Sequence, residues 1–174
     1  LKLISTEMPV GINYTAGVSA QLKSAVILAG LNSFGTTEIN EIKASRDHTE
    51  KMLQKNSHAM KIISSPKKII KIFGKKYLNP TKITIPGDPS SASFFTALTI
   101  LNKNSRLLIK KVGLNPTRIG FYELLKKHGA KIKFINKKIL GNEIIGDIEV
   151  KSGELKKPII ASKEFYERTT DEFP

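Results

Sequence analysis

The chain repeats a pattern of predicted elements at a spacing of 70 to 72 residues, and this repeat constrains the fold more than any other feature. Ser19-Ala20 and Ser91-Ala92 each open a segment with helical character. A predicted strand follows each helix, at 36–42 in the first copy and at 106–112 in the second. The repeat therefore predicts two related α/β units in succession.

The predicted helices have start signals and apolar faces. Ser19 and Asp88-Pro89 have the chemistry of helix caps and first-turn residues. Further helices are predicted to begin at Ser45 and at Asn115-Pro116, the second of them ending at Gly129. The expected apolar faces are Leu22, Ala25, Val26 and Ala29 in the first helix, and Phe94, Phe95 and Leu98 in its counterpart.

Short strands are expected after the second helix of each copy. They are predicted at 60–63, 69–73 and 82–85 in the first copy, and at 131–135, 147–151 and 158–161 in the second. Pro86-Gly87 lies between the copies and is the expected domain junction, which divides the chain into domains 1–85 and 86–174.

Composition excludes several classes of protein. With 40% apolar and 25% charged residues the chain is globular in character. It contains no cysteine, which excludes disulfides and thiolate metal sites. No apolar run is long enough for a membrane span and the N-terminus has no signal-peptide pattern, so we expect a cytoplasmic protein that does not bind membranes. We interpret both ends as cuts in a longer protein.

The net charge of +14 raises the question of nucleic-acid binding. Lysine carries most of this charge, in short pairs that are spread along the chain. RGG tracts, an RNP-type aromatic motif and Cys/His fingers are absent from the sequence. A non-catalytic basic module that binds nucleic acid is therefore kept only as an alternative, and a positive field would also attract an anionic substrate.

Two hexapeptides predict a site for a small anionic metabolite. The first, Ser19-Ala20-Gln21-Leu22-Lys23-Ser24, and the second, Ser45-Arg46-Asp47-His48-Thr49-Glu50, each place a serine at a predicted helix start. Helix starts offer unpaired backbone N–H groups and the positive end of the helix dipole. Either hexapeptide alone is more often only a cap, so the prediction depends on the pair.

These hexapeptides and several later segments resemble the signatures of one family in order. The matching segments are Ser19 to Ala25 with Leu28 to Leu31, Gly35 to Thr37 with Ser45 to Glu50, Pro86 to Phe95, Val112 to Arg118, Gly146 to Ile148, and Asp171 to Pro174. They are similar to the motifs of 5-enolpyruvylshikimate-3-phosphate synthase, also called 3-phosphoshikimate 1-carboxyvinyltransferase. Phe173 departs from the family pattern, which usually has an aliphatic residue at this position.

The resemblance implies an enolpyruvyl transferase fold of the α/β class, with two lobes built from repeated βαβαββ units, of which this chain holds about one unit of each lobe. It implies an enzyme that transfers the carboxyvinyl group of phosphoenolpyruvate to the 5-hydroxyl of shikimate 3-phosphate and releases phosphate, in the shikimate pathway of aromatic amino acid biosynthesis. No metal or organic cofactor is expected. The full-length enzyme is expected to be a monomer.

The resemblance also implies roles for individual residues. Asp171 matches the catalytic aspartate that accepts a proton from the reacting hydroxyl, although by itself it reads as an ordinary surface acid. Lys23 is expected to be structural or to act at long range, and His48 to position the site or contact the ligand. Asp88 is expected to be a cap and Arg118 a structural ion-pair partner. The residues expected to bind shikimate 3-phosphate are Ser19, Ala20, Gln21, Ser45 and Arg46.

Other family motifs do not occur in the chain. An N-terminal Lys-Ser-x-x-x-Arg and a glycine-rich segment for phosphoenolpyruvate are missing, and the C-terminal Lys and Arg motifs would follow Pro174. We therefore predict that the 174-residue piece alone is inactive. UDP-N-acetylglucosamine enolpyruvyl transferase shares the fold and the donor and is the alternative enzyme, and RNA cyclase relatives of the fold are a more distant one.

Overall fold

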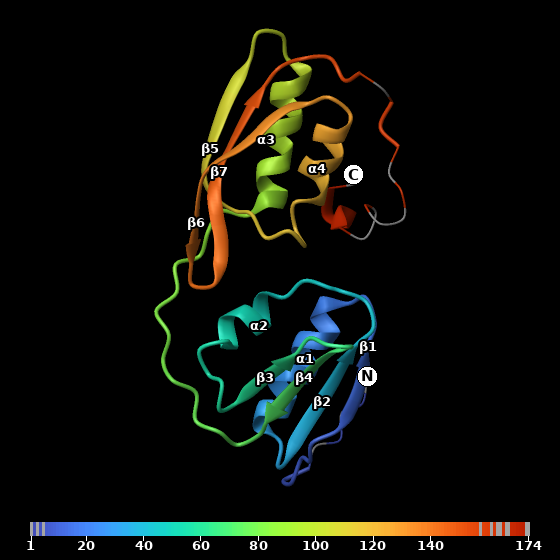
Figure 1. Cartoon of the computed structure of the whole chain (residues 1–174), viewed down its shortest axis with the longest axis vertical. Helices are drawn as coiled ribbons and strands as arrows, with labels where there is room; N and C mark the ends of the chain where they lie inside the picture. Colours follow the sequence, from blue (N-terminus) through green and yellow to red (C-terminus); the bar gives the residue numbers. More distant parts are fainter. Residues whose placement is uncertain are drawn as a thin grey trace. The chain divides into compact units, whose positions relative to one another are not determined.

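The chain forms two compact units, residues 1–82 and 83–174 (Figure 1). The computed structural model describes residues 2, 4, 6–156, 158–160, 162, 165 and 168–172. Each unit combines a sheet with α-helices, so the predicted α/β class is confirmed. Among the described residues, no helix has the length and apolar character needed to cross a membrane.

The first unit has the element order βαβαββ. Its sheet has the strand order β1-β2-β4-β3, in which β1 and β2 are parallel and the other neighbours are antiparallel. A Cβ atom at Gly30 would lie 3.0 Å from the Thr37 Cβ, so glycine allows α1 to approach the sheet closely. The elements are β1 (Asn13–Ala16), α1 (Ala20–Asn32), β2 (Thr36–Glu41), α2 (His48–Leu53), β3 (Met60–Ile63) and β4 (Lys68–Phe73).

The second unit repeats this arrangement with its first strand reduced to a single bridge. Gly87 pairs in parallel with Val112, as β1 pairs with β2 in the first unit. The antiparallel sheet has the order β5-β7-β6, and α3 and α4 cover one of its faces (Figure 1). The elements are α3 (Pro89–Leu101), β5 (Arg106–Gly113), α4 (Gly120–Lys127), β6 (Lys131–Leu140), β7 (Glu143–Lys151) and the 3₁₀ turn η1 (Thr170–Glu172).

Two of the four predicted helix starts are confirmed. The Ser19 side chain accepts a hydrogen bond from the Leu22 N–H and caps α1, and Asp88 caps α3 in the same way. The predicted starts at Ser45 and Asn115 are wrong: α2 begins at His48 and α4 at Gly120.

Competing hydrogen bonds explain both late starts. Ser45 donates to the Glu41 carboxylate, which lies before it in the chain and not in the following turn. Asn115 accepts from the backbone N–H and hydroxyl of Thr117, which forms a local turn before α4. Side chains of this type favour turns over helix when they bond to nearby backbone groups.

The predicted apolar faces of α1 and α3 are also wrong. Leu22 is 60% exposed and Phe94 is 62% exposed, whereas α1 buries a face that is displaced by about one residue. Helical periodicity identifies an apolar stripe but not which of two faces meets the sheet, and both faces of these helices carry apolar residues. The buried residues are Lys23, Ile27, Gly30 and Leu31 in α1, and Pro89, Ala92, Ser93, Thr96 and Thr99 in α3.

The strands predicted at 82–85 and 158–161 do not form in the part of the chain that the structure describes. Residues 82–85 connect the two units, where Ile85 is 87% exposed. Residues 158–160 pair with no strand, and Ala161 lies outside the described residues. Apolar residues in these segments have no neighbouring strand to supply a hydrogen-bond ladder. The other six predicted strands are confirmed within one or two residues or as parts of longer strands.

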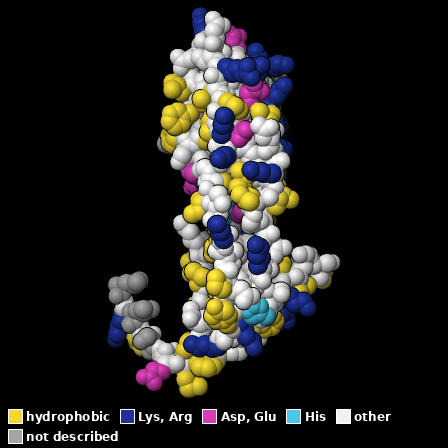
Figure 2. All heavy atoms as spheres, turned by 90° about the vertical axis from the view of Figure 1, so that its left-hand side faces the viewer, with side chains coloured by type: hydrophobic (Ala, Val, Ile, Leu, Met, Phe, Trp, Pro, Cys, Tyr) yellow, Lys and Arg dark blue, Asp and Glu magenta, His cyan; other side chains and the backbone are white. Residues whose placement is uncertain are grey.

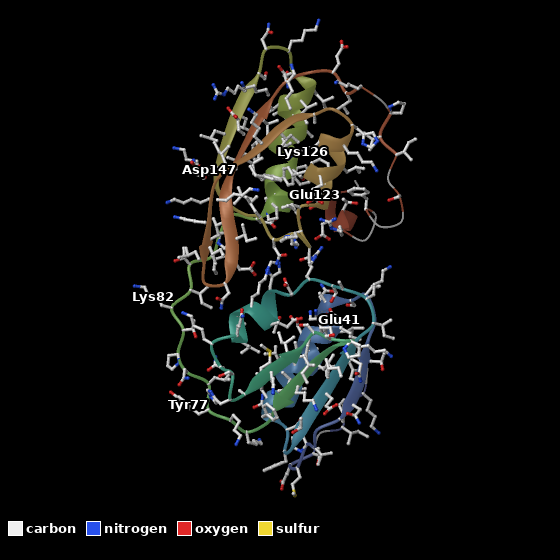
Figure 3. All side chains as sticks on the ribbon, in the orientation of Figure 1. Glu41, Tyr77, Lys82, Glu123, Lys126 and Asp147 are labelled. Atoms are coloured by element: carbon white, nitrogen blue, oxygen red, sulfur yellow. The ribbon has the colours of Figure 1, made fainter. Side chains whose placement is uncertain are left out.

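The Asp147 carboxylate, on the central strand β7, accepts a hydrogen bond from each of the two outer strands at a point where the strand pairing shifts register. The pairing of β5 with β7 shifts between Ile109 and Val112, and that of β6 with β7 shifts between Ile135 and Lys138. The Asp147 carboxylate accepts from the Lys111 N–H at 2.8 Å and from the Asn136 side chain at 2.8 Å. Lys111 and Asn136 both have positive φ, so one carboxylate stabilises two bulges whose backbone conformation is uncommon. Figure 3 labels Asp147 in the sheet of the second unit.

Replacing Asp147 with alanine is expected to lower the thermal midpoint of the second unit, because both bulges lose their hydrogen-bond acceptor. Calorimetric unfolding of the chain would measure this. The matched control is Glu149→Ala on the same strand, whose ion pair with the exposed Arg106 should contribute little. Equal effects of the two changes would contradict the role of Asp147.

Candidate functional site

The first predicted binding segment lies at the N-terminus of α1. Ser19 is the cap, and its Oγ accepts from the Leu22 N–H at 3.3 Å, which leaves the hydroxyl proton available to a ligand. Ala20 begins the helix and Gln21 follows it with an exposed side chain. The first-turn N–H groups of a helix have no partner within the helix, so this end can bind an anion.

The second predicted segment follows β2 and precedes α2. Ser45 donates both its backbone N–H and its hydroxyl to Glu41 Oε1, at 3.1 and 3.0 Å. Arg46 is half-buried, and His48 is the first residue of α2, with an exposed side chain. The segment is therefore fixed at Ser45 by the end of β2.

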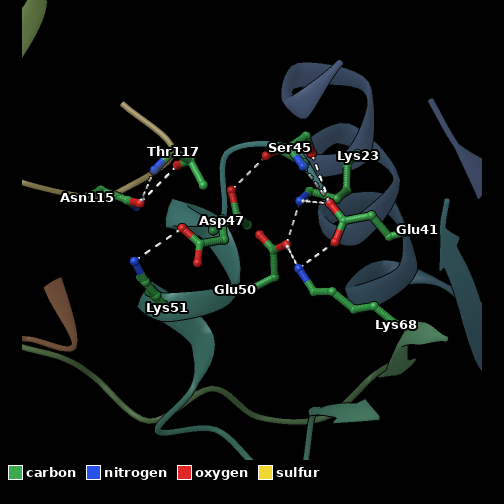
Figure 4. Close-up of polar contacts among 11 residues, drawn as sticks. Lys23, Glu41, Ser45, Asp47, Glu50, Lys51, Lys68, Asn115 and Thr117 are labelled. Atoms are coloured by element: carbon green, nitrogen blue, oxygen red, sulfur yellow. Dashed lines mark hydrogen bonds and ion pairs between the residues drawn. The ribbon is translucent and has the colours of Figure 1, made fainter. Parts of the chain in front are cut away.

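A buried ionic cluster of four residues underlies these two segments, and sequence reasoning did not anticipate most of it. Lys23 Nζ lies 2.7 Å from Glu41 Oε1 and 2.6 Å from Glu50 Oε1 (Figure 4). Lys68 Nζ lies 2.5 Å from Glu41 Oε2 and 3.5 Å from Glu50 Oε1. Two cations thus balance two carboxylates, and the side chains of Lys23 and Glu41 are 0% and 1% exposed. We refer to Lys23, Glu41, Glu50 and Lys68 as the ionic cluster.

The expected structural role of Lys23 is confirmed, whereas Glu41, Glu50 and Lys68 were missed. Lys23 lies four residues before Ile27 and eight before Leu31 and so shares their buried helix face, a position that the pattern of apolar residues alone does not assign to a lysine. Lys68 could be recognised only from the antiparallel register, in which it stands opposite Glu41. Glu50 belongs to the second hexapeptide. The inward orientation of its side chain depends on the start of α2 at His48, which the sequence did not predict.

The ionic cluster determines the charge of Glu41. Burial acts to raise the pKa of its carboxyl, but hydrogen bonds from Lys23, Lys68 and the Ser45 backbone lower the pKa from 4.5 to about 2. For Lys68, burial acts to lower the pKa, yet hydrogen bonding and attraction to Glu41 raise it above its ordinary value. Both groups are therefore charged at neutral pH.

The lowered pKa of Glu41 predicts a pH-dependent stability. The contribution of ionised Glu41 is fully present above about pH 4.5 and is lost as the pH falls towards about 2, because the unfolded chain binds the proton more tightly. The difference in free energy of unfolding between wild type and Glu41→Gln should therefore narrow between about pH 5 and pH 3. Urea unfolding would measure it, with the exposed Glu154→Gln as control. A difference that stays constant over this range would contradict the assignment.

Further contacts join α1 to α2. The hydroxyls of Ser24 and Thr49 lie 2.7 Å apart, and Lys23 reaches Glu50 of α2. These contacts begin one turn after Ser19 and end a few residues after Arg46. The two predicted binding segments are thus attached to a common buried framework within the first unit.

Asp171 lies in the second unit, within a network centred on Arg118. Arg118 Nη2 donates to Asp88 Oδ1 at 2.7 Å and to Ser90 Oγ at 2.9 Å, and its Nη1 lies 3.6 Å from Asp171 Oδ2. The Asp171 side chain is 42% exposed, so its carboxylate is accessible to a ligand. The expected roles of Asp88 as a cap and of Arg118 as an ion-pair partner are confirmed.

Asp88 is charged at neutral pH. Burial acts to raise the pKa of this carboxyl, but the Ser91 backbone and side-chain hydrogen bonds and the Arg118 charge hold it below its ordinary value. Among the described residues, no group of three or more His, Asp or Glu side chains is arranged to hold a metal ion.

The fold and these segments define a member of the enolpyruvyl transferase class. Residues 4–160 match the family model described as EPSP synthase (3-phosphoshikimate 1-carboxyvinyltransferase). The chain belongs to the EPSP synthase family. The resemblance deduced from the motifs is thereby confirmed.

Curated relatives carry the same family name. The 3-phosphoshikimate 1-carboxyvinyltransferase of Petrotoga mobilis is 48% identical over 143 residues, which cover 82% of this chain and 32% of the relative. That of Thermodesulfovibrio yellowstonii is 44% identical over 174 residues, covering 100% of this chain and 38% of the relative. The chain therefore spans about a third of the length of these relatives.

A solved structure agrees with the fold. The EPSP synthase from Acinetobacter baumannii superposes with a TM-score of 0.78 at 36% identity, covering 95% of this chain and 37% of that one. The chain thus has a partial enolpyruvyl transferase fold.

Proposed function

We propose that the whole protein transfers the carboxyvinyl group of phosphoenolpyruvate to the 5-hydroxyl of shikimate 3-phosphate and releases phosphate. The observation that carries the proposal is the capped N-terminus of α1, where Ser19, Ala20 and Gln21 stand in the family's motif. A hydroxyl and free first-turn N–H groups are suited to the 3-phosphate. The protein would act in the cytoplasm, as a monomer and without a cofactor.

Individual roles follow from this proposal. Ser19, Ala20 and Gln21 bind shikimate 3-phosphate from α1, and Ser45 and Arg46 complete that side, with the guanidinium suited to paired hydrogen bonds to an anion. Asp171 accepts the proton of the reacting hydroxyl, and its exposure together with its anchoring by Arg118 supports this role. His48 is a positioning residue or a ligand contact.

The two units are proposed to belong to different lobes of the whole enzyme. Residues 1–85 would be part of the first lobe, which binds shikimate 3-phosphate, and residues 86–174 part of the second, ending at the Asp171 motif. The repeated order of elements in the two units supports this assignment.

A nucleic-acid function is not proposed. On the face shown in Figure 2, several lysine and arginine side chains gather towards the top of the view, and the others stand apart with apolar and uncharged atoms between them. In the sheet of the second unit, the acidic residues Asp147 and Glu149 of β7 lie among the lysines of β5, β6 and β7. Such mixed charge supports attraction of a small anion more than tracking of a polyanion.

Phosphate release by the whole protein tests the proposal. The protein would be given phosphoenolpyruvate with shikimate 3-phosphate, and in parallel with UDP-N-acetylglucosamine. Release with shikimate 3-phosphate alone is expected. Release only with the nucleotide sugar would assign the alternative enzyme, and release with neither would overturn the proposed function.

The isolated 174-residue chain is expected to give no turnover, because it spans about a third of its relatives and lacks the family's phosphoenolpyruvate motifs. The same phosphate assay on the purified chain measures this, with the whole protein as positive control. Detectable turnover by the chain would refute the prediction.

A further inference from the structure

We propose that Glu41 is a positioning residue for the Ser45-Arg46 segment, and that buried Lys23 holds Glu41 in place. This inference rests on the proposed function, since it concerns the same shikimate 3-phosphate site. It assigns to Glu41 and Lys23, but not to the other two members of the ionic cluster, a role in substrate binding in addition to their role in the core.

One oxygen atom of Glu41 holds the backbone and the side chain of Ser45. Glu41 Oε1 accepts from Lys23 Nζ at 2.7 Å and from the Ser45 N–H and hydroxyl at 3.1 and 3.0 Å (Figure 4). Both donors of Ser45 therefore point to one atom, and the direction in which the chain leaves towards Arg46 follows from the position of that atom.

Lys23 connects this atom to the other binding segment. Its backbone N–H donates to the Ser19 carbonyl at 3.2 Å in the first turn of α1, while its ammonium group binds Glu41. Ser19 and Ser45 are thus joined through one lysine and one glutamate. Since the Lys23 and Glu41 side chains are 0% and 1% exposed, water does not screen this connection.

The arrangement also fixes the hydrogen-bonding character of Ser45. Its hydroxyl proton is directed to the Glu41 carboxylate, so its oxygen is left to accept a hydrogen bond. An acceptor at this position suits a substrate hydroxyl, and phosphate recognition is left to Arg46 and the α1 N-terminus. Glu41 therefore contributes to the discrimination between hydroxyl and phosphate groups.

The test uses the whole protein with the double change Glu41→Met/Lys68→Met. It removes the acceptor of Ser45 but leaves Lys23 balanced by Glu50, and replacing a buried ion pair with apolar residues of similar length is often neutral for stability. We expect KM for shikimate 3-phosphate to rise about tenfold with kcat within about twofold, since two hydrogen bonds are lost. Lys68→Met alone is the matched control, because Lys68 does not contact Ser45, and its KM should stay within about twofold of wild type.

Hydrogen exchange of the Ser45 amide supplies a readout that is independent of activity. Exchange should be faster in the double variant than in the Lys68→Met control. An unchanged KM, or an unchanged exchange rate, in a double variant that keeps its thermal midpoint would overturn the inference. If wild-type protein releases no phosphate, the proposed function fails, and the exchange comparison alone decides whether Glu41 holds the segment.

Discussion

We expect Asp171→Asn to lower kcat for the proposed carboxyvinyl transfer by the whole protein about 10²–10⁴-fold, because the change removes the proposed proton acceptor. Asparagine has the same size and keeps hydrogen-bonding capacity, but it cannot take up the proton of the 5-hydroxyl. The Asp171 side chain is 42% exposed, and at 3.6 Å its ion pair with Arg118 is long, so the loss of this charge should leave the fold intact. Steady-state phosphate release measures kcat, and calorimetric titration of shikimate 3-phosphate should show binding close to wild type.

Asp88→Asn is the matched control for this experiment. Asp88 shares Arg118 with Asp171 and is its closer partner, at 2.7 Å. Asparagine caps helices about as well as aspartate, so α3 should be retained. A large loss of kcat in both variants would show that activity depends on the Arg118 network and not on proton transfer by Asp171. A normal rate in Asp171→Asn would leave Asp171 as an ordinary surface acid.

We expect Lys23→Met to lower the free energy of unfolding of the first unit by about 3–5 kcal/mol, the range found when one partner of a buried ion pair is removed. Glu41 and Glu50 would then share only Lys68, whose side chain is 31% exposed and lies 3.5 Å from Glu50. Methionine fills the space of the lysine stem, so the loss reports charge and not a cavity. Urea unfolding followed by circular dichroism measures the change.

Two further variants test this explanation. Lys51→Met removes a partly exposed i,i+4 ion pair with Asp47 and should cost about 0.3–0.5 kcal/mol. Lys23→Met/Glu50→Gln removes one charge of each sign and should recover part of the lost stability. If Lys23→Met costs no more than Lys51→Met, the ionic cluster contributes little to stability.

Features that depend on local chemistry could be predicted from the sequence. Ser19 and Asp88 cap their helices because their side chains bond to N–H groups three residues ahead, which requires no knowledge of the rest of the fold. The 70-residue repeat and most strands likewise follow from patterns along the chain. The family motifs located the candidate site residues.

Features that depend on distant partners could not be predicted. Ser45 has the same cap chemistry as Ser19, but Glu41 takes its hydroxyl and N–H, so α2 begins at His48. The choice between two apolar faces of α1 was decided by Lys23, whose burial requires two carboxylates from other elements. Hydrophobic pattern alone assigns a lysine to the surface, and only the folded arrangement makes the inward face more favourable.

The balanced charges of the ionic cluster have an evolutionary consequence. Any single replacement that removes the charge of Lys23, Glu41 or Glu50 leaves an uncompensated charge in the interior, whereas neutral replacement of a cation together with a carboxylate preserves the balance. We therefore expect these positions to change in pairs during divergence of the family. Lys68 is the most exposed member, so we expect it to be the first of the four to be substituted. The four sites would then show correlated substitution although they come from four different elements, α1, β2, α2 and β4.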